Sequence, residues 1–290
     1  MQKRILLSFD VEDWFQVENF RKVFPHEVWN NCQIRAVNNT FKILDLLDKY
    51  EIKATFFVLG WIAQKVPHLV KEIFQRGHEV ACHGYSHIIN YSIPIEKIFN
   101  DIERAKFTLE DIIGDEVVGY RAPNFSIFKE VFDVLEKLGF YYDSSYHPFF
   151  KNKRYGRLKI AKRDSLFFVR DQLVEIPMSV NKILNIDVSV AGGGYFRLMP
   201  YFMFNWLASR YLDKYKMLVL YFHPWEFDPG QPKVNGVQIN YRIRHYVGIK
   251  SSIKKIEKFI DIQKQKGSIF EIYKDVAKFY LSRNKDFKNE

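Results

Sequence analysis

The stretch Glu79-Val-Ala-Cys82-His83-Gly-Tyr-Ser-His87 begins as a short apolar strand and continues with two imidazoles four residues apart. If the chain makes a helical turn after the strand, the two rings share one face and can bind one metal ion. Such a pair is a weak signal by itself, because most histidines at this spacing lie on a protein surface. The side chains at the ends of other strands decide between these interpretations.

The same arrangement, an apolar run followed by a polar or charged side chain, recurs along the chain. Four further side chains follow separate apolar runs in this way: Asp10, Arg121, Asp143 and His223. Helical patterns lie between these runs, one of them from Pro94 to Gly114. Alternating strands and helices predict a parallel sheet with helices outside it, and parallel strands open their carboxyl ends on one face. We therefore expect these side chains to converge at one mouth of an α/β barrel.

The first strand, Ile5-Leu-Leu-Ser-Phe9, ends in the acidic cluster Asp10-Val-Glu12-Asp13. Asp10 and Glu12 are two residues apart and share a face of an extended chain, whereas Asp13 points elsewhere unless the chain has turned. Acidic residues after a strand can also form a turn or cap a helix without any catalytic role. The cluster therefore leaves open which of its carboxylates takes part in a site.

The composition is that of a globular protein, and the charge is unevenly distributed along the chain. The 290 residues are 47% hydrophobic and include 27 Phe and 17 Tyr, which is ample for a buried core. The formal net charge is +10, and residues 231–290 hold 14 Lys or Arg against 6 Asp or Glu. This segment predicts a basic helical surface, with membrane or acidic-glycan contact as an alternative. No nucleic-acid partner is expected, because the aromatic residues fall in apolar runs and no binding motif is present.

Targeting signals and cysteines bear on the location of the protein. The apolar run near Met1 is too short for a signal peptide, and no run reaches the ~18 apolar residues of a membrane span. Cys32 and Cys82 form no disulfide framework. These features predict a cytoplasmic protein, with peripheral contact at the inner face of the membrane through the basic C-terminal region.

Five motifs in order resemble those of the polysaccharide deacetylases, the NodB-like members of carbohydrate esterase family 4. The matching segments are residues 8–13, 83–87, 121–125, 143–145 and 222–226. The longer pattern, with Gly192-Gly-Gly-Tyr-Phe-Arg197, is similar to a subgroup tied to bacterial exopolysaccharide and surface-glycan production. The resemblance implies a distorted (β/α) barrel, often of seven strands, in a single domain over residues 1–290. Its motif-bearing core would occupy about residues 1–230, with residues 231–290 packed on it as a helical extension.

The resemblance also implies a metal-dependent hydrolase that removes N-acetyl groups from amino sugars. Its implied ligands are Glu12, His83 and His87, which bind one divalent ion, preferably Zn²⁺ with other divalent ions as alternatives. Many members have two adjacent aspartates in the first motif, and here Val11 intervenes. Asp13 is therefore an alternative to Glu12 as the carboxylate ligand.

Roles for other residues follow from the same resemblance. Asp10 would be the general base, Arg121 its partner and His223 the general acid. Asp143 would be the acidic partner of His223 or of Arg121. The backbone N–H near Asn124 would hold the oxyanion, and the rings of Trp225 and Tyr85 would line the sugar site. The fourth motif lacks its usual tryptophan, so part of the groove must come from elsewhere.

The implied substrate is an N-acetylated glycan or a lipid-linked or nucleotide-linked sugar precursor. One alternative is a hydrolase of another carbon–nitrogen bond on the same barrel, because fold alone does not settle the substrate. A second is a non-catalytic glycan-binding relative. The presence of a base and an acid together, at Asp10 and His223, argues against the second alternative.

Overall fold

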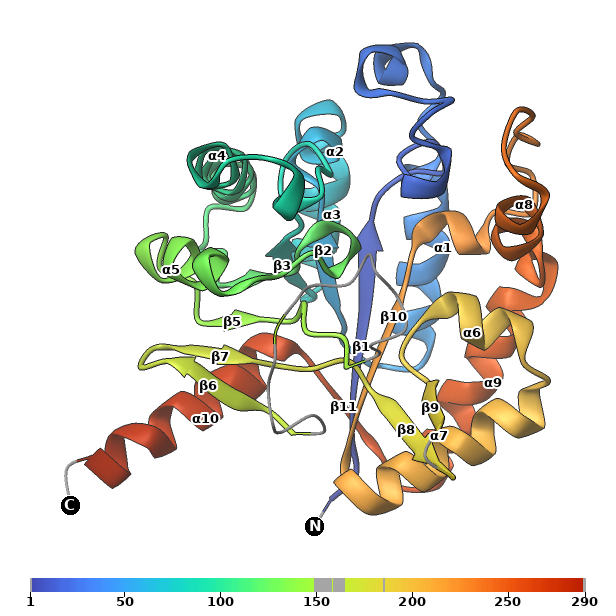
Figure 1. Cartoon of the computed structure of the whole chain (residues 1–290). Coiled ribbons are helices and arrows are strands. Elements are labelled where there is room, and N and C mark those ends of the chain that lie inside the picture. Colours follow the sequence, from blue (N-terminus) through green and yellow to red (C-terminus); the bar gives the residue numbers. More distant parts are fainter. Residues whose placement is uncertain (1, 149–157, 159–164, 185, 289–290) are drawn as a thin grey trace.

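A curled sheet of mostly parallel strands lies at the centre of the molecule, with helices around its outer side (Figure 1). The computed structural model describes residues 2–148, 158, 165–184 and 186–288. In space the strands follow the order β10 (Met217–Phe222), β1 (Arg4–Val11), β2 (Thr55–Val58), β3 (Glu79–Cys82), β4 (Gly119–Tyr120), β5 (Tyr142–Asp143), β7 (Leu173–Glu175) and β6 (Phe167–Arg170). Neighbours from β10 to β7 pair in parallel, which gives a row of seven parallel strands. The expected α/β barrel is confirmed as a curled, parallel half-barrel.

Shorter elements complete the sheet layer. Strand β6 is antiparallel to β7, and β11 (Ile269–Glu271) runs parallel to the first half of β1. Strands β8 (Val180–Ile183) and β9 (Ile186–Ser189) form a separate antiparallel hairpin. The α-helices of the described residues are α1 (Ala36–Lys49), α2 (Gly60–Lys65), α3 (Pro67–Gln75), α4 (Ile95–Ile113), α5 (Lys129–Lys137), α6 (Gly193–Leu198), α7 (Tyr201–Tyr215), α8 (Ile239–Tyr246), α9 (Ser252–Gln265) and α10 (Tyr273–Lys288).

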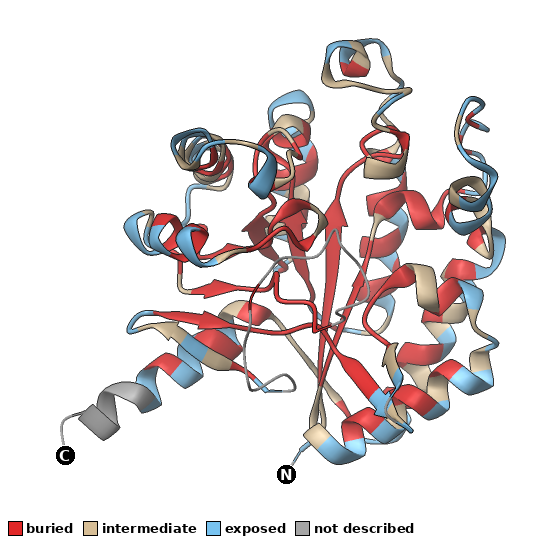
Figure 2. Cartoon of the chain, viewed as in Figure 1, coloured by how far each residue is buried: buried red, intermediate tan, exposed pale blue. Residues whose placement is uncertain are grey.

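Strand β1 shows how the sequence divides the interior into two layers. Its alternate residues Ile5, Leu7 and Phe9 belong to the core between the sheet and the helices. Leu6 faces the opposite side, where it packs with Val219 and other residues inside the half-barrel. Full burial of each such side chain stabilises the fold by about 1.5–3 kcal/mol. Figure 2 shows the result: the central strands of the sheet are buried, the edge strands β6 and β11 are partly exposed, and the exposed residues of the helices lie on their outer faces.

The register of the parallel strands brings their carboxyl ends to one level. Phe9 of β1 pairs with Phe222 of β10, and Cys82 of β3 pairs with Tyr120 of β4. The next residue along each of these four strands is therefore set at the same edge of the sheet, as the alternating pattern predicts.

The C-terminal segment enters the barrel rather than only covering it. Strand β11 pairs with β1, and Tyr273, Val276 and Ala277 of α10 lie in the inner apolar cluster. In Figure 1 this helix crosses below the open strands β5 to β7. Among the described residues, no helix combines the length and the apolar character needed to cross a lipid bilayer.

Candidate active site

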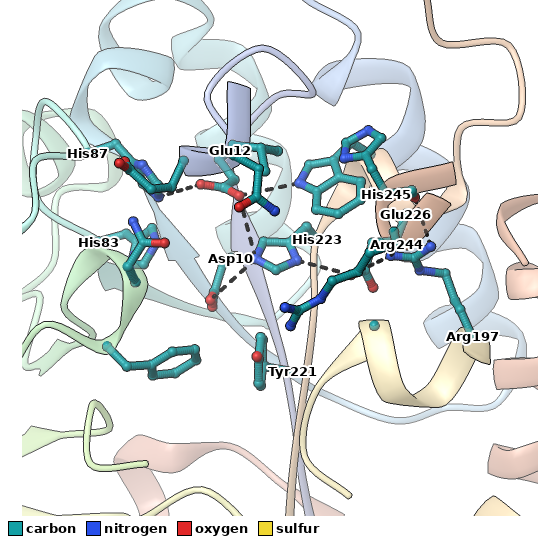
Figure 3. A pocket seen from close by; sticks show the side chains of 17 residues that line it. Asp10, Glu12, His83, His87, Arg197, Tyr221, His223, Glu226, Arg244 and His245 are labelled. Carbon is teal, nitrogen blue, oxygen red and sulfur yellow. Dashed lines mark hydrogen bonds and ion pairs between the residues drawn. The ribbon is translucent and has the colours of Figure 1, made fainter. Parts of the chain in front are cut away.

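A pocket opens at the carboxyl ends of β1, β3 and β10 (Figure 3). It is lined by five of the side chains that the strand-end pattern singles out: Asp10, Glu12, His83, His87 and His223. Helices α6 and α8 supply the wall on the other side, through Arg197, Arg244 and His245. The pocket therefore joins residues that are more than 200 positions apart in the chain.

Three buried side chains form a cluster with the geometry of a metal site. Glu12, His83 and His87 each offer a ligating atom, and these atoms all lie within 4.8 Å of one another. The Nδ1–H of His83 donates to the carbonyl oxygen of Arg121 at 2.8 Å, which leaves Nε2 available as a ligand. Burial lowers the pKa of His83 to about 4, so this ring is neutral at neutral pH.

The loop between the two histidines is not the helical turn that their spacing suggests. Gly84 and His87 adopt left-handed backbone conformations, with φ of 71° and 51°, and the ring centroids of His83 and His87 lie 5.4 Å apart. Asp101 of α4 holds the loop by accepting hydrogen bonds from the backbone N–H groups of Tyr85 and Ser86, at 2.7 and 3.1 Å. Carboxylate contacts from a neighbouring helix thus stabilise a conformation that is costly for His87.

The acidic cluster after β1 separates into two functions. Glu12 points into the pocket, where its Oε2 lies 2.5 Å from Nε2 of His87. Asp13 points away, and its Oδ2 accepts the backbone N–H groups of Arg35 and Ala36 at 2.6 and 2.8 Å, at the start of α1. Burial raises the pKa of Asp13 to about 6, although these N–H groups oppose the shift. Asp13 therefore acts as a helix cap from a distant position in the sequence.

Arg121 is fully buried beneath the pocket and joins several strands. Its Nη1 donates to Oδ1 of Asp10 at 2.5 Å and to the Ser8 hydroxyl at 2.9 Å. Its Nη2 donates to the hydroxyls of Tyr273 and Ser144 at 3.1 and 3.2 Å, and its Nε donates to the Ser144 carbonyl at 3.0 Å. All five N–H groups of the guanidinium therefore have acceptors, and only one of them is a carboxylate. Asp10 and Arg121 form an ion pair whose orientation is fixed.

His223 lies among carboxylates. Its Nδ1 is 3.3 Å from Oε1 of Glu226, and its Nε2 is 3.5 Å from Oε1 of Glu12 and 3.9 Å from Oδ2 of Asp10. Burial alone would lower the pKa of His223, but the charges of Glu12, Glu226 and Asp10 outweigh it and raise the pKa to about 9. The ring is therefore an imidazolium at neutral pH.

Among the described residues, Asp143 makes no hydrogen bond or ion pair with His223 or Arg121, although the charge of Arg121 acts to lower its pKa. Its Oδ1 accepts from the Ser145 hydroxyl at 2.6 Å, and that hydroxyl accepts from the backbone N–H of Ala122 at 2.7 Å. Burial raises the pKa of Asp143 and, together with the Asp143 charge, raises the pKa of Glu175 well above its ordinary value. Asp143 and Glu175 are neighbours in the register of β5 and β7, and Ser145 links Asp143 to the loop after β4. The acidic residues near His223 are Glu226, at 3.3 Å, Glu12 and Asp10.

The three residues expected to contact substrate have different surroundings. Asn124 lines the pocket in a left-handed conformation with φ of 54°. Trp225 also lines it, but its indole is stacked between the rings of His223 and His245, at centroid distances of 5.0 and 4.3 Å. The faces of the Trp225 ring are therefore covered by the two imidazoles, and the ring turns an edge toward the pocket.

Tyr85 packs away from the pocket between α2 and α4. Its hydroxyl donates to Gln64 and accepts from Nη2 of Arg104 at 2.7 Å, and the Arg104 guanidinium lies 3.6 Å from the centre of the ring. A side chain at Gly60 would collide with the ring. The expectation that Tyr85 lines the sugar site is therefore wrong, because the loop conformation turns its ring into the core.

Sequence patterns overlooked several residues that the structure brings to this site. Tyr273 reaches Arg121 from the C-terminal helix α10, and no motif marks it. Glu226 could have been found from its position three residues after His223, since it stands in the same motif. Arg197 pairs with Glu226 at 3.6 Å and donates to the carbonyl oxygen of His245 at 2.8 Å.

Sequence comparison identifies relatives of the first half of the chain. Residues 2–142 match the family described as polysaccharide deacetylase, and residues 144–272 match a domain of unknown function, DUF3473. A peptidoglycan-N-acetylglucosamine deacetylase of Bacillus cereus is 33% identical over 122 residues, covering 39% of this chain and 57% of that protein. A peptidoglycan deacetylase of Helicobacter pylori is 31% identical over 104 residues, 36% of each chain. The chain therefore spans only part of the length of these relatives.

Solved structures share the fold over nearly the whole chain. A protein of Mycobacterium smegmatis described as a polysaccharide deacetylase has a TM-score of 0.64 at 18% identity, covering 98% of this chain and 92% of that one. A pseudoenzyme of the CE4 family from Bacillus anthracis has a TM-score of 0.56 at 13% identity, covering 95% and 66%. Such low identities show the fold alone. The polysaccharide deacetylase family model thus matches residues 2–142, just under half of the chain, and the solved structures share the fold over nearly all of it.

Proposed function

We propose that this protein is a metal-dependent hydrolase that removes N-acetyl groups from the amino sugars of a glycan or glycan precursor. The observation that carries the proposal is one pocket that holds the Glu12–His83–His87 cluster, the carboxylate of Asp10 and the imidazolium of His223. The similarity to peptidoglycan deacetylases supports it, because the aligned family segment, residues 2–142, includes four of these five residues.

The donor set suits a catalytic divalent cation. Two imidazoles and one carboxylate are a common ligand set for catalytic Zn²⁺, and they leave positions open for water and substrate. The fixed tautomer and neutral state of His83 fit a ligand role, and other divalent ions remain alternatives to Zn²⁺. When bound, such an ion polarises a carbonyl group and lowers the pKa of water.

The protein's own residues would then move the protons. Asp10 would accept a proton from the attacking water, and Arg121 would orient the Asp10 carboxylate through the 2.5 Å contact. His223, held as an imidazolium by Glu226 and its other acidic neighbours, would donate a proton to the departing amine. Asn124 lines the pocket with a φ of 54°, and a backbone N–H near it would stabilise the developing oxyanion.

The proposal extends to the cellular role, the form of the substrate, the location and the domain boundaries. The sequence pattern supports a role in exopolysaccharide or surface-glycan production, and a lipid-linked or nucleotide-linked precursor as substrate. The basic C-terminal segment supports peripheral contact with a membrane, and the expected location is the cytoplasm. The pairing of β11 with β1 supports one domain that includes this segment.

The direct test is acetate release from a panel of N-acetylated sugar nucleotides, lipid-linked sugars and oligosaccharides. We expect release from at least one class, loss of release after treatment with a chelator, and recovery when Zn²⁺ is added back. Release that a chelator leaves unchanged would contradict the metal. Hydrolysis only of formyl or cyclic amides would favour another carbon–nitrogen hydrolase. Failure of the metal-loaded protein on every amide would place it with the non-catalytic relatives.

Paired substitutions separate the roles of the two neighbouring carboxylates. We expect Glu12→Gln to lower the bound metal, measured by elemental analysis, because it removes the anionic ligand from the cluster. Asp13→Asn should keep the metal but lower the melting temperature, because the cap of α1 loses charge and one acceptor oxygen, at a cost of about 0.5–2 kcal/mol. The reverse pattern, with metal lost from Asp13→Asn alone, would assign the ligand to Asp13.

A further inference from the structure

One cationic side chain of the pocket, Arg244, has no counter-charge among the described residues. Arg244 of α8 lines the pocket, and Figure 3 shows its guanidinium pointing toward the side where Tyr221 and Asp10 lie. Arg244 is exposed, and no hydrogen bond or ion pair of its guanidinium is found among the described residues. The backbone of Gly194 faces it, since a Cβ built there would lie 4.0 Å from Nε of Arg244.

The acidic residues that line the pocket are already matched by other cations. Asp10 is paired with Arg121, and Glu18 lies 3.6 Å from Arg21. Glu226 contacts both Arg197 and His223, as described above. Glu12 contacts His87 and belongs to the candidate metal cluster. No carboxylate of the lining is therefore left for Arg244.

The second arginine on this wall differs from Arg244 in its surroundings. Arg197 is buried, and besides Glu226 it donates to the carbonyl oxygens of His245 and Val247 at 2.8 and 2.5 Å. These contacts of the Arg197 guanidinium hold α6 against α8. Arg244 extends from α8, and its donors meet no acceptor within the part of the chain that the structure describes. A planar guanidinium suits bidentate contact with a carboxylate or phosphate.

We infer that the substrate carries an oxyanion, a carboxylate or a phosphate, which Arg244 binds while the acetamido group faces Asp10 and His223. Arg244 is then a specificity-determining residue that separates anionic from neutral N-acetyl sugars. This inference rests on the proposed function, because it places the anion on a substrate of that site. It narrows the substrate to acidic or phosphate-linked amino sugars and leaves the chemistry of deacetylation unchanged.

The test measures equilibrium binding to the metal-loaded protein by NMR titration. Three sugars serve as probes: methyl N-acetylglucosaminide, which is neutral, N-acetylmuramic acid, which has a carboxylate, and N-acetylglucosamine 1-phosphate. We expect one or both anionic sugars to bind about 10- to 100-fold more tightly than the neutral one, the range of a charge-assisted hydrogen bond. The anionic sugar with the higher affinity shows whether the substrate carries a carboxylate or a phosphate.

The matched variants are Arg244→Gln and Arg242→Gln. Both replace an arginine of α8, but only Arg244 is in the pocket lining. Arg244→Gln should bring the anionic-to-neutral ratio of Kd close to one, and Arg242→Gln should keep the wild-type ratio. Equal wild-type affinity for the three sugars, or an unchanged ratio in Arg244→Gln, would overturn the inference. Selective binding without any acetate release would contradict the proposed function and leave the anion subsite standing.

Discussion

We expect His83→Ala to lose the bound divalent ion and acetate release together. The Nε2 of His83 is the free nitrogen of a ring whose other nitrogen is held by the Arg121 carbonyl. Only two donors of the cluster would remain, too few for a catalytic Zn²⁺ site. Removing a group that only hydrogen-bonds to a metal ligand commonly lowers metal affinity or activity by about 10–100-fold. Removing the ligand itself should therefore lower both by at least about 100-fold. Metal content and rate are measured on the same sample.

A buried ring cannot be removed without some loss of stability, so His83→Ala needs controls. His83→Gln keeps a donor that can reach the Arg121 carbonyl, and it should lose metal while losing less stability. His78→Ala removes another buried ring, one that accepts from the backbone N–H of Ala54 at 3.3 Å and does not line the pocket. It should lower the melting temperature and keep the metal. If both His83 variants fold and retain full metal and full activity, the cluster is not a catalytic metal site.

The convergence of distant residues could be predicted because parallel strands share an edge. Pairing of Phe9 with Phe222 sets Asp10 and His223 at one level, although the two strands are more than 200 positions apart in the chain. Alternation along β1 separates the apolar residues that face the helices from Asp10 and Glu12, which line the pocket. Both inferences need only strand patterns and the rule that parallel sheets collect polar groups at their carboxyl ends.

The surroundings of individual side chains could not be predicted in the same way. The ring of Tyr85 points into the core because Gly84 and His87 take left-handed conformations, which no spacing rule contains. Asp143 meets Glu175 because β5 pairs with β7, a neighbour that is not the next strand in the sequence. These details depend on the path of loops and on sheet order, and short motifs do not encode either one.

The Arg121 contacts show why residues of the C-terminal segment matter to the site. Ser8, Ser144 and Tyr273 supply uncharged acceptors, so a fully buried guanidinium needs only one carboxylate partner, Asp10. A buried ion pair is stable only when its remaining hydrogen-bonding groups are satisfied. The segment expected to be a peripheral extension therefore contributes Tyr273 to the support of the proposed base.

The second large effect is expected from Asp10→Asn, which should keep the metal and lose most turnover. The variant keeps the shape of the side chain but removes the charge that would accept the proton of water. General base catalysis commonly contributes about 10²–10⁴-fold, so we expect kcat to fall by that factor. Glu12, His83 and His87 are unchanged, and metal content should remain near that of the wild type.

Loss of the Asp10 charge leaves Arg121 without its anion, and breaking a buried pair can cost about 3–5 kcal/mol. The folded fraction of Asp10→Asn is therefore measured by near-UV circular dichroism at the assay temperature. Glu175→Gln is the matched control, because Glu175 is also a buried carboxyl, its pKa is raised by burial, and it does not line the pocket. It should retain activity, whereas folded, metal-loaded Asp10→Asn should not. Turnover of that variant at the wild-type rate would exclude Asp10 as the base.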